Sequence, residues 1–318
     1  MAIKINKDGT ELSGLVDNDV IQPFGLEETN IRGRTVRLGK VLGDIMQRHN
    51  YPLPVCGLLS EIVTLAVLLS GMLKYDGVFS LQIKSEGVIR TLAADVTSSG
   101  DVRAYADFDA EKLKECESKE TYYHLLGKGY MSFTVQSDVK TEHSYQGIVA
   151  LQGKSVLNDV EHYFEQSEQI ETSFKIAVHP QDGYWQTGGI MIQQMPEDEP
   201  EAKRHDEKQA EEWNTAKILL ATCQDEEMLS PALHSADVLY RLFNEVGIRV
   251  YSPKHLHFGC RCNKEKVEAV VATLPKDETI PLCEQEGSLL VKCEFCSEEY
   301  MLTYEDLKRI YNKANKGE

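Results

Sequence analysis

Four cysteines near the C-terminus have the types and spacing of a metal site. Cys260 and Cys262 form a C-x-C pair, and Cys293 and Cys296 form a C-x-x-C pair after thirty intervening residues. Two close pairs separated by one supersecondary unit can bring four thiolates to a tetrahedral zinc ion. Oxidants attack thiolates rather than thiols, so a cluster that holds Zn²⁺ is also a potential redox switch.

The other cysteines and two nearby histidines have simpler interpretations. Isolated cysteines are expected to be small buried or surface thiols: Cys56, Cys116 and Cys223. Cys283 lies inside the cysteine-rich segment and could be an extra oxidisable thiol, although a core or loop position is favoured. His255 and His257 precede the first pair and could replace a sulfur ligand, but four cysteines already complete a tetrahedral site.

The charge balance argues against a nucleic-acid partner. The chain has 51 acidic and 34 basic residues in a length of 318, which gives a net charge of −17. Binding to phosphates needs clustered Lys and Arg side chains, which this composition does not favour. A large net charge also keeps a protein soluble when apolar surface becomes exposed.

The apolar segments favour a protein that neither crosses a membrane nor is secreted. The longest apolar stretch, Leu53 to Leu73, is long enough to span a bilayer, but Glu61 lies near its centre and Gly57 and Gly71 interrupt it. We therefore expect a buried helix. The first ten residues, MAIKINKDGT, lack the apolar core of a signal peptide. We expect a cytoplasmic protein, whose thiols stay reduced at rest, rather than a disulfide framework.

The hydrophobic pattern predicts an α+β fold in three parts. Residues 1–195 form the predicted N-terminal core domain, with mixed helices and sheets rich in antiparallel strands. Its helices are predicted at 34–50, 53–74 and 157–168, and its strands at 78–84, 88–95, 102–108, 131–136, 145–151, 171–178 and 189–194. Residues 196–250 form a predicted acidic and helical linker, and residues 251–318 a small four-cysteine zinc module.

The linker segment combines an acidic run with apolar helical faces. Residues 197–212 carry eight acids and three bases, as in a solvated linker or an exposed helical face, and a short apolar stripe follows at 213–223. A second helix is predicted with Ser230 as its N-cap, Pro231 at its first position and Gly247 beyond its end. Its predicted apolar face comprises Ala232, Leu233, Ala236, Leu239, Tyr240 and Phe243. These helices must dock on the core domain, the zinc module or a partner.

The predicted zinc module has two helices around a hairpin. A helix follows Cys262, and its inward residues are predicted to be Val267, Val270, Val271 and Leu274. Residues 288–294 and 299–303 form a hairpin around the second cysteine pair, and residues 304–312 form a closing helix.

The chain resembles the heat shock protein 33 family, the redox-regulated 33 kDa chaperonins. The likeness rests on FGCRC at the first cysteine pair and CEFCSEEYMLTYEDL at the second. It extends upstream to HYFEQSEQIETSFKIAV at residues 162–178, to the Gly188-Gly189-Ile190 strand, and to the N-terminal segments RGRTVRLG and LLSEIVTLAVLLSGMLKYDGVFSLQIKSEG. The likeness covers nearly the whole chain.

The resemblance implies an ATP-independent holding chaperone that oxidants and unfolding stress activate. It implies that Cys260, Cys262, Cys293 and Cys296 are both the zinc ligands and the redox sensors. Oxidation is expected to pair Cys260 with Cys262 and Cys293 with Cys296. The implied partners are unfolded or partly unfolded client proteins, with a homodimer in the oxidised state. The core domain would bind clients and dimerise, and the linker would respond to the redox state.

Two other classes of function remain open on sequence alone. A constitutive zinc-ribbon adaptor would bind one folded partner, and its binding would not increase on oxidation. A zinc enzyme would keep an open coordination position, whereas four cysteines close the site. A thiol oxidoreductase would need a low-pKa C-x-x-C at a helix N-terminus, but Cys293 and Cys296 lie in strand-and-turn sequence. These patterns favour a chaperone that is not an enzyme.

Overall fold

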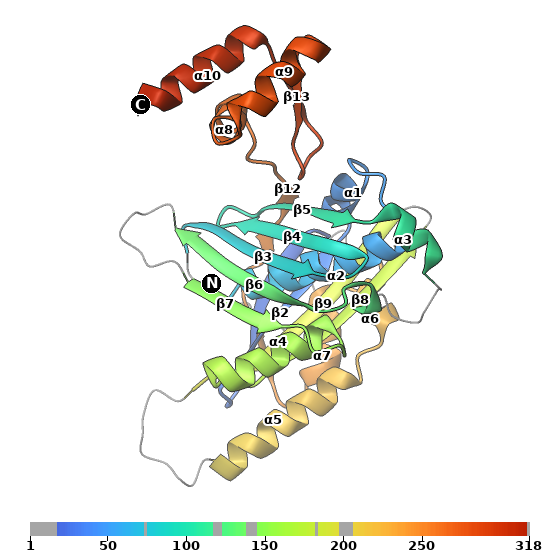
Figure 1. The fold of residues 1–318 in the computed structure, drawn as a ribbon. Helices are drawn as coiled ribbons and strands as arrows, with labels where there is room; N and C mark the ends of the chain where they lie inside the picture. The colour runs from blue at the N-terminus through green and yellow to red at the C-terminus, as the bar shows by residue number, and fades with distance from the viewer. Residues whose placement is uncertain are drawn as a thin grey trace. The chain divides into compact units, whose positions relative to one another are not determined.

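The protein forms two compact units, Met1–Phe258 and Gly259–Glu318. The computed structural model describes residues 18–72, 75–116, 123–137, 145–181, 184–196 and 206–316 (Figure 1). Residues 251–258 therefore fold with the first unit. The functional division into core, linker and zinc module stays a prediction, and residues 197–205 of the predicted acidic run lie outside the described residues.

The first unit is built from two sheets. In the first sheet the strand order is β10 (Ile248–Val250), β1 (Val20–Leu26), β2 (Ile31–Leu38), β9 (Tyr184–Gln194) and β8 (Thr172–Gln181), and β11 (Lys254–His255) also pairs with β1. In the second sheet the order is β12 (His257–Phe258), β5 (Asp101–Phe108), β4 (Ile89–Thr97), β3 (Gly77–Ser85), β6 (Gly129–Ser137) and β7 (Tyr145–Ala150). Neighbouring strands are antiparallel except β12 and β5. The α+β prediction is confirmed.

A long helix, α2 (Leu53–Ser70), lies against strands of both sheets. It is long and apolar enough to cross a membrane, and it is the only such helix among the described residues, but 83% of it is buried inside the protein. Its apolar residues occur on every side because protein surrounds it. The prediction of a buried helix in this stretch is therefore confirmed. Shorter elements complete the unit: α1 (Lys40–Met46), α3 (Ala110–Glu115), a 3₁₀ turn (Tyr123–Leu125), α4 (Val156–Tyr163) and a π-helical turn (Phe164–Glu168).

The predicted helix at 34–50 is wrong in its first part. Residues up to Leu38 belong to β2, which pairs with β1 and β9 on its two sides. Helix α1 begins only after Gly39, where the carboxylate of Asp19 accepts hydrogen bonds from the backbone N–H groups of Gly39, Lys40 and Val41 at 2.9–3.0 Å. This remote cap and the missed strand β1 depend on tertiary pairing, which the local apolar spacing did not reveal.

Three linker helices cover one face of the first sheet: α5 (Asp206–Ala221), α6 (Asp225–Leu229) and α7 (Ser235–Phe243). The apolar side chains that meet there come from the sheet, namely Phe24, Leu26, Ile31, Ala177, Ile190, Ile192 and Val250, and from the linker, namely Trp213, Ala216, Leu220, Cys223, Met228, Val238, Leu239, Leu242 and Phe243. We call this set the linker cluster. Of the three docking surfaces expected for these helices, the core domain is the one observed.

The start of the second linker helix was predicted wrongly. Ser230 is the C-cap of α6, and Pro231 lies in the connection to α7, whose N-cap is His234. The backbone N–H of His234 donates to the carboxylate of Asp237 at 3.2 Å, so a capping box replaces the predicted serine cap. Leu233 precedes α7 and is exposed, and Ala232 is exposed as well.

The second unit is a small fold around one hairpin. It contains α8 (Lys264–Val271), α9 (Lys276–Glu286), β13 (Leu289–Lys292), β14 (Glu299–Leu302) and α10 (Tyr304–Lys316). Its buried core consists of Val267, Val271, Cys283, Leu289, Leu302, Leu307, Ile310 and Tyr311. Val270 and Leu274, which were predicted to face inward, are 58% and 44% exposed. Helix α9 was not predicted because it is highly charged and contains Pro281, which normally disrupts a helix.

Candidate metal centre

The first cysteine pair lies in the short loop that leads into α8. The N-cap of this helix is Asn263, whose side-chain oxygen accepts a hydrogen bond from the backbone N–H of Lys266 at 2.8 Å. The ammonium group of Lys266 turns back and donates to the carbonyl of Arg261 at 2.8 Å. Arg261 stands between Cys260 and Cys262, so these two bonds fix the loop that presents both sulfur atoms.

The second cysteine pair forms the turn between β13 and β14. The backbone N–H of Cys293 donates to the carbonyl of Glu298 at 2.9 Å, and the N–H of Ser297 donates to the carbonyl of Cys293 at 2.8 Å. Ser297 has a left-handed backbone with φ of 59°, which lets the chain reverse directly after Cys296. The hairpin thus turns both thiols toward the same point.

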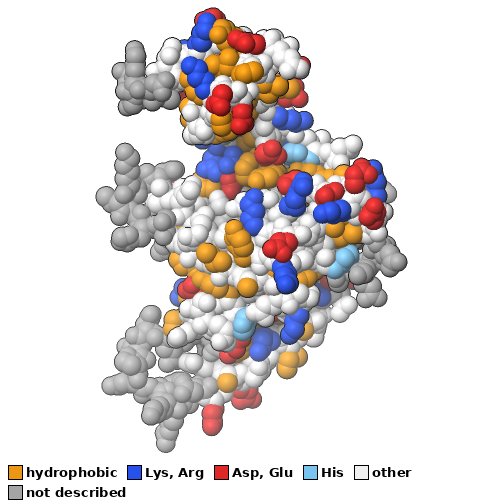
Figure 2. Space-filling model, viewed as in Figure 1, with side chains coloured by type: hydrophobic (Ala, Val, Ile, Leu, Met, Phe, Trp, Pro, Cys, Tyr) orange, Lys and Arg blue, Asp and Glu red, His pale blue; other side chains and the backbone are white. Residues whose placement is uncertain are grey.

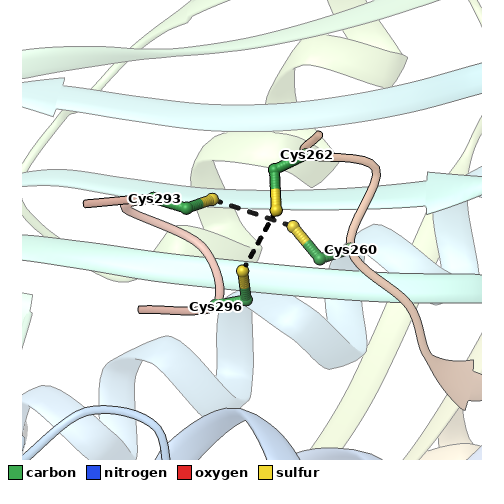
Figure 3. Close-up of side chains that lie close together, drawn as sticks. All are labelled: Cys260, Cys262, Cys293 and Cys296. Carbon is green, nitrogen blue, oxygen red and sulfur yellow. Dashed lines mark hydrogen bonds between the residues drawn. The ribbon is translucent and has the colours of Figure 1, made fainter. Parts of the chain in front are cut away.

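The four thiols converge from these two loops (Figure 3). Their Sγ atoms all lie within 4.8 Å of one another, with Cys262 and Cys296 3.3 Å apart and Cys260 and Cys293 3.8 Å apart. Four sulfurs bound tetrahedrally to zinc at about 2.3 Å would be about 3.8 Å apart. The cluster therefore has the size and donor set of a closed four-sulfur metal site. All eight cysteines are free thiols in this structure.

The electrostatics of the cluster favour a bound cation. Burial is the largest cause that raises the pKa of the Cys293 and Cys296 thiols. The neighbouring thiols raise the pKa of Cys296 further, whereas at Cys293 the charge of Cys260 raises the pKa and the hydrogen bond with Cys296 lowers it. Four thiolates so close together would repel one another, so a divalent cation is what would keep all four deprotonated. The donor set fits Zn²⁺, which would tie the hairpin to the loop before α8.

A tyrosine that the sequence analysis did not single out contacts the cluster. The Tyr300 hydroxyl, on β14, donates to the Sγ of Cys262 at 3.2 Å, and this bond is the main cause that raises the pKa of Tyr300. Such outer hydrogen bonds orient metal ligands and tune their basicity. The available signal was an aromatic residue four positions after Cys296 on a predicted strand.

The remaining cysteines and the two histidines are not members of the four-thiol cluster. Cys283 is buried in the core of the second unit, where its thiol approaches the carbonyl of Leu302 at 3.8 Å, so the expected core position is confirmed. His255 is on β11 and His257 on β12, in the first unit, and His257 contacts Asp101 at 2.7 Å. The isolated thiols are buried at Cys56 and Cys223 and partly buried at Cys116.

The predicted apolar face of the linker is partly buried in the linker cluster. Ala236, Leu239 and Phe243 are at most 5% exposed, whereas Tyr240 is only partly buried and Leu233 is exposed. The sequence analysis missed the sheet side of this interface. The available signal was the run GGIMI at residues 188–192 of β9, which has no polar side chain, as in a strand covered on both faces. All five residues are buried.

Charges of both signs are interspersed on the face of the first unit drawn in Figure 2. Orange apolar side chains lie between them, and on that face the basic side chains do not merge into one broad patch. This distribution gives no support to a phosphate-binding surface on the face shown.

Comparison with known proteins identifies the family. The family model described as Hsp33 protein matches residues 19–303, which includes the two sheets, the linker helices and the cysteine cluster. This chain belongs to the Hsp33 family. The 33 kDa chaperonin of Caulobacter vibrioides is 32% identical over 297 residues, covering 91% of this chain and 96% of the relative. The 33 kDa chaperonin of Pseudomonas aeruginosa is 32% identical over 301 residues, covering 93% and 96%.

A solved Hsp33 homologue has the same fold. The structure of the 33 kDa chaperonin from Thermotoga maritima superposes with a TM-score of 0.77 at 23% identity and covers 94% of this chain and all of that one. Membership of the Hsp33 family, together with the C-terminal cysteine cluster, fits a chaperone.

Proposed function

We propose that this protein is a redox-regulated, ATP-independent holdase that prevents the aggregation of unfolding proteins under oxidative and heat stress. The observation that carries the proposal is the convergence of four free thiols within 4.8 Å in a small unit, whose described residues form one buried apolar cluster of eight side chains. A unit with so small a core depends on its metal, and its metal depends on the redox state of the thiols.

The magnitudes favour a switch that destabilises the second unit. A structural zinc site contributes apparent binding free energy of about 10–16 kcal/mol, whereas a whole domain is stable by only about 5–15 kcal/mol. Disulfides between sequence neighbours would close loops of three or four residues and contribute roughly 2 kcal/mol each. Two such bonds do not replace the metal, so the oxidised second unit should unfold.

The chemistry of activation is a four-electron oxidation. The four thiolates become two disulfides, and two molecules of peroxide accept the electrons and, with four protons, leave as four molecules of water. Disulfides cannot serve as thiolate ligands, so Zn²⁺ would leave. We propose the pairing of Cys260 with Cys262 and of Cys293 with Cys296. All four sulfur atoms lie close enough for other pairings, so peptide mapping of the oxidised protein has to establish the bonds.

The connection between the two units favours release of the linker. After α7 the chain passes through β10, β11 and β12, which are only two or three residues long and pair with β1 or β5 before the second unit begins at Gly259. Short strands of this kind open at low free-energy cost. Once the second unit unfolds, we expect these strands and then α5–α7 to detach. The apolar side of the linker cluster on the sheet would then bind clients.

A light-scattering assay tests the proposal. A thermally unfolding test protein is mixed with this protein, either reduced with zinc or oxidised with peroxide under mild heat. We expect only the oxidised form to suppress scattering, and to do so without ATP. Equal protection by both forms would contradict the switch.

The alternative of a constitutive adaptor has one observation in its favour. Several large apolar side chains of the second unit are exposed: Val270, Leu274, Leu282, Leu290 and Met301. An adaptor would use such a surface to bind a folded partner while the metal is present, and oxidation would abolish the binding. The same pair of samples in the scattering assay separates the two functions, because a holdase gains activity where an adaptor loses its only binding surface.

The remaining parts of the proposal follow from the same scheme. We propose that the core domain binds clients and forms a homodimer in the oxidised state, that the linker responds to the redox state, and that the protein acts in the cytoplasm without enzymatic activity. Sedimentation of the reduced and oxidised protein tests the dimer, which predicts a doubled mass after oxidation only.

A further inference from the structure

One buried arginine joins the core sheet to the linker. Arg37 on β2 is 1% exposed, although it carries a full charge. Its Nε donates to the carbonyl of Met228, in α6, at 2.9 Å, and its Nη1 donates to the carbonyl of Leu233, just before α7, at 2.7 Å. Arg37 thus holds both ends of the connection between the two helices. No carboxylate contacts it within the described residues.

A glycine beside Arg37 provides the space for the same connection between α6 and α7. Gly188 on β9 is the cross-strand partner of Arg37. A Cβ atom at Gly188 would lie 2.8 Å from the Cβ and 2.9 Å from the carbonyl oxygen of Met228, so the backbone of α6 would have to move. Gly188 is not among the glycines with positive φ, so the requirement for glycine at this position comes from the close approach of the linker.

The next glycine along the strand serves the opposite face of the sheet. A Cβ atom at Gly189 would meet Thr64 at 2.9 Å and Leu68 at 3.1 Å, both on α2. Successive residues of a strand point to opposite faces, so the Gly188-Gly189 pair gives each face one position without a side chain. The atoms nearest to a Cβ at Gly188 belong to Met228 in the linker, whereas those nearest to a Cβ at Gly189 belong to the core.

We propose that Arg37 and Gly188 form a seat that positions the connection between α6 and α7 and thereby, together with the linker cluster, holds the linker on the core sheet. Arg37 is a positioning residue, whose role in client binding rests on the proposed function, whereas its role in holding the linker does not. Two features distinguish this seat from the other polar contacts of the linker. The ion pairs Lys175–Asp225 and Arg241–Glu227 have partly exposed side chains and contribute little. The guanidinium of Arg37, in contrast, is buried with its charge compensated only by the two linker carbonyls among the described groups.

The seat makes release cooperative. While the connection is in place, the buried charge of Arg37 needs both carbonyls, because a buried ion without hydrogen-bond partners is strongly unfavourable. When the connection moves away, water reaches the guanidinium and replaces both carbonyls. Intermediate positions, in which Arg37 is dry but has lost one carbonyl, are disfavoured, so the linker should be either docked or released.

The linker contains a thiol that reports on its release. Cys223 lies between α5 and α6, is 1% exposed and belongs to the linker cluster. Alkylation of the zinc-loaded, reduced, full-length protein, followed by mass spectrometry of the Cys223 peptide, measures how often the linker opens. The variants are Arg37→Met and Gly188→Ala, and Arg37→Lys retains the charge but only part of the hydrogen bonding. We expect Cys223 to be alkylated roughly 10- to 100-fold faster in the first two, and by an intermediate amount in Arg37→Lys.

Two controls separate the seat from general destabilisation. Arg103→Met removes a largely buried arginine of the second sheet, which pairs with Asp95 at 2.6 Å and does not belong to the linker cluster. Gly189→Ala disturbs the packing on α2. Both should lower the thermal stability without a preferential increase at Cys223 over the buried thiol Cys56 on α2.

The alkylation experiment and the aggregation assay test the seat and the proposed function separately, so either hypothesis can fail while the other stands. If Arg37→Met and Gly188→Ala alkylate at Cys223 no faster than the two controls, the seat is wrong, whatever the chaperone assay shows. If Cys223 opens as expected and zinc content is unchanged, but the reduced variants do not suppress aggregation, the seat stands and the linker does not cover the client site. If Arg37→Met fails to fold, Arg37→Lys and Gly188→Ala give the same comparison.

Discussion

A charge placed on the buried face of α7 should release the linker without oxidation. Leu239 is completely buried in the linker cluster, whereas Leu233, six residues earlier, is 36% exposed. Replacement of Leu239 by Glu removes about 1.5–3 kcal/mol of apolar burial, and retention of the carboxylate in that site would cost several kcal/mol more. The same substitution at Leu233 introduces an equal charge at a partly exposed position, so it should change the stability much less.

The combined penalty for Leu239→Glu is comparable with the whole stability of a domain, which is about 5–15 kcal/mol. The protein can avoid it by detaching α5–α7, because the two sheets and α2 form a separate buried cluster that does not include Leu239. We therefore expect the core to stay folded while the backbone amides of the linker exchange with solvent.

Hydrogen exchange of the reduced, zinc-loaded proteins provides the measurement. Amides of α7 should lose protection in Leu239→Glu and keep it in Leu233→Glu, while amides of β3 and β4 stay protected in both. Partial suppression of aggregation should accompany the loss only in Leu239→Glu. Protected α7 amides in Leu239→Glu would refute the reasoning that the linker cluster is what retains these helices.

Three further outcomes are expected. Replacement of any one of the four clustered cysteines by Ser should reduce the zinc content sharply, and near-full zinc in all four variants by metal analysis would exclude the site. Tyr300→Phe removes the hydrogen bond to Cys262 and should weaken zinc binding about 10-fold in a chelator competition, with zinc still bound at saturation. Burial raises the pKa of Glu61, on α2, to about 7, so its contribution to stability is complete below the unfolded pKa near 4.5 and is lost as pH rises through 7. The wild-type protein should therefore lose up to about 3 kcal/mol of unfolding free energy between pH 5 and 9, and Glu61→Gln should not. The measurement is the melting temperature as a function of pH, which should be flatter in the variant. An unchanged slope would show that the carboxyl is hydrated.

The convergence of the four cysteines could be predicted from the sequence because its information is local. Each pair needs only two or three residues to present two thiols, and the turn chemistry around Asn263 and Ser297 completes the geometry within a few positions. The hydrogen bond from Tyr300 could not be predicted in the same way. It depends on the register of β13 and β14, in which Tyr300 pairs with Val291, and this register emerges only when the hairpin packs on its core.

The incorrect predictions of β2, of α9 and of the start of α7 have a common physical cause. The strand β2 was mistaken for helix because residues 34–38 keep apolar spacing compatible with both structures, and pairing with β1 and β9 decides between them. Helix α9 tolerates Pro281 because the helix is anchored by Cys283 and Thr279 in the core of the second unit. Ser230 and Pro231 have the residue types of a helix start but follow α6, whose end they occupy. In each case tertiary contacts overrode a local preference.

The position of the linker was the feature that sequence patterns left open, and the structure shows why it matters. The amphipathic pattern of a helix predicts that its apolar face is covered, but it does not identify the surface that covers it. Here the covering surface is a sheet that is itself buried on both faces, so the sheet and the linker each hide the apolar surface of the other. Under the proposed function, the contacts that cover this apolar surface also define the surface that release of the linker would expose. We therefore propose that this chaperone needs no separate client site, because clients would bind the sheet surface that the linker covers.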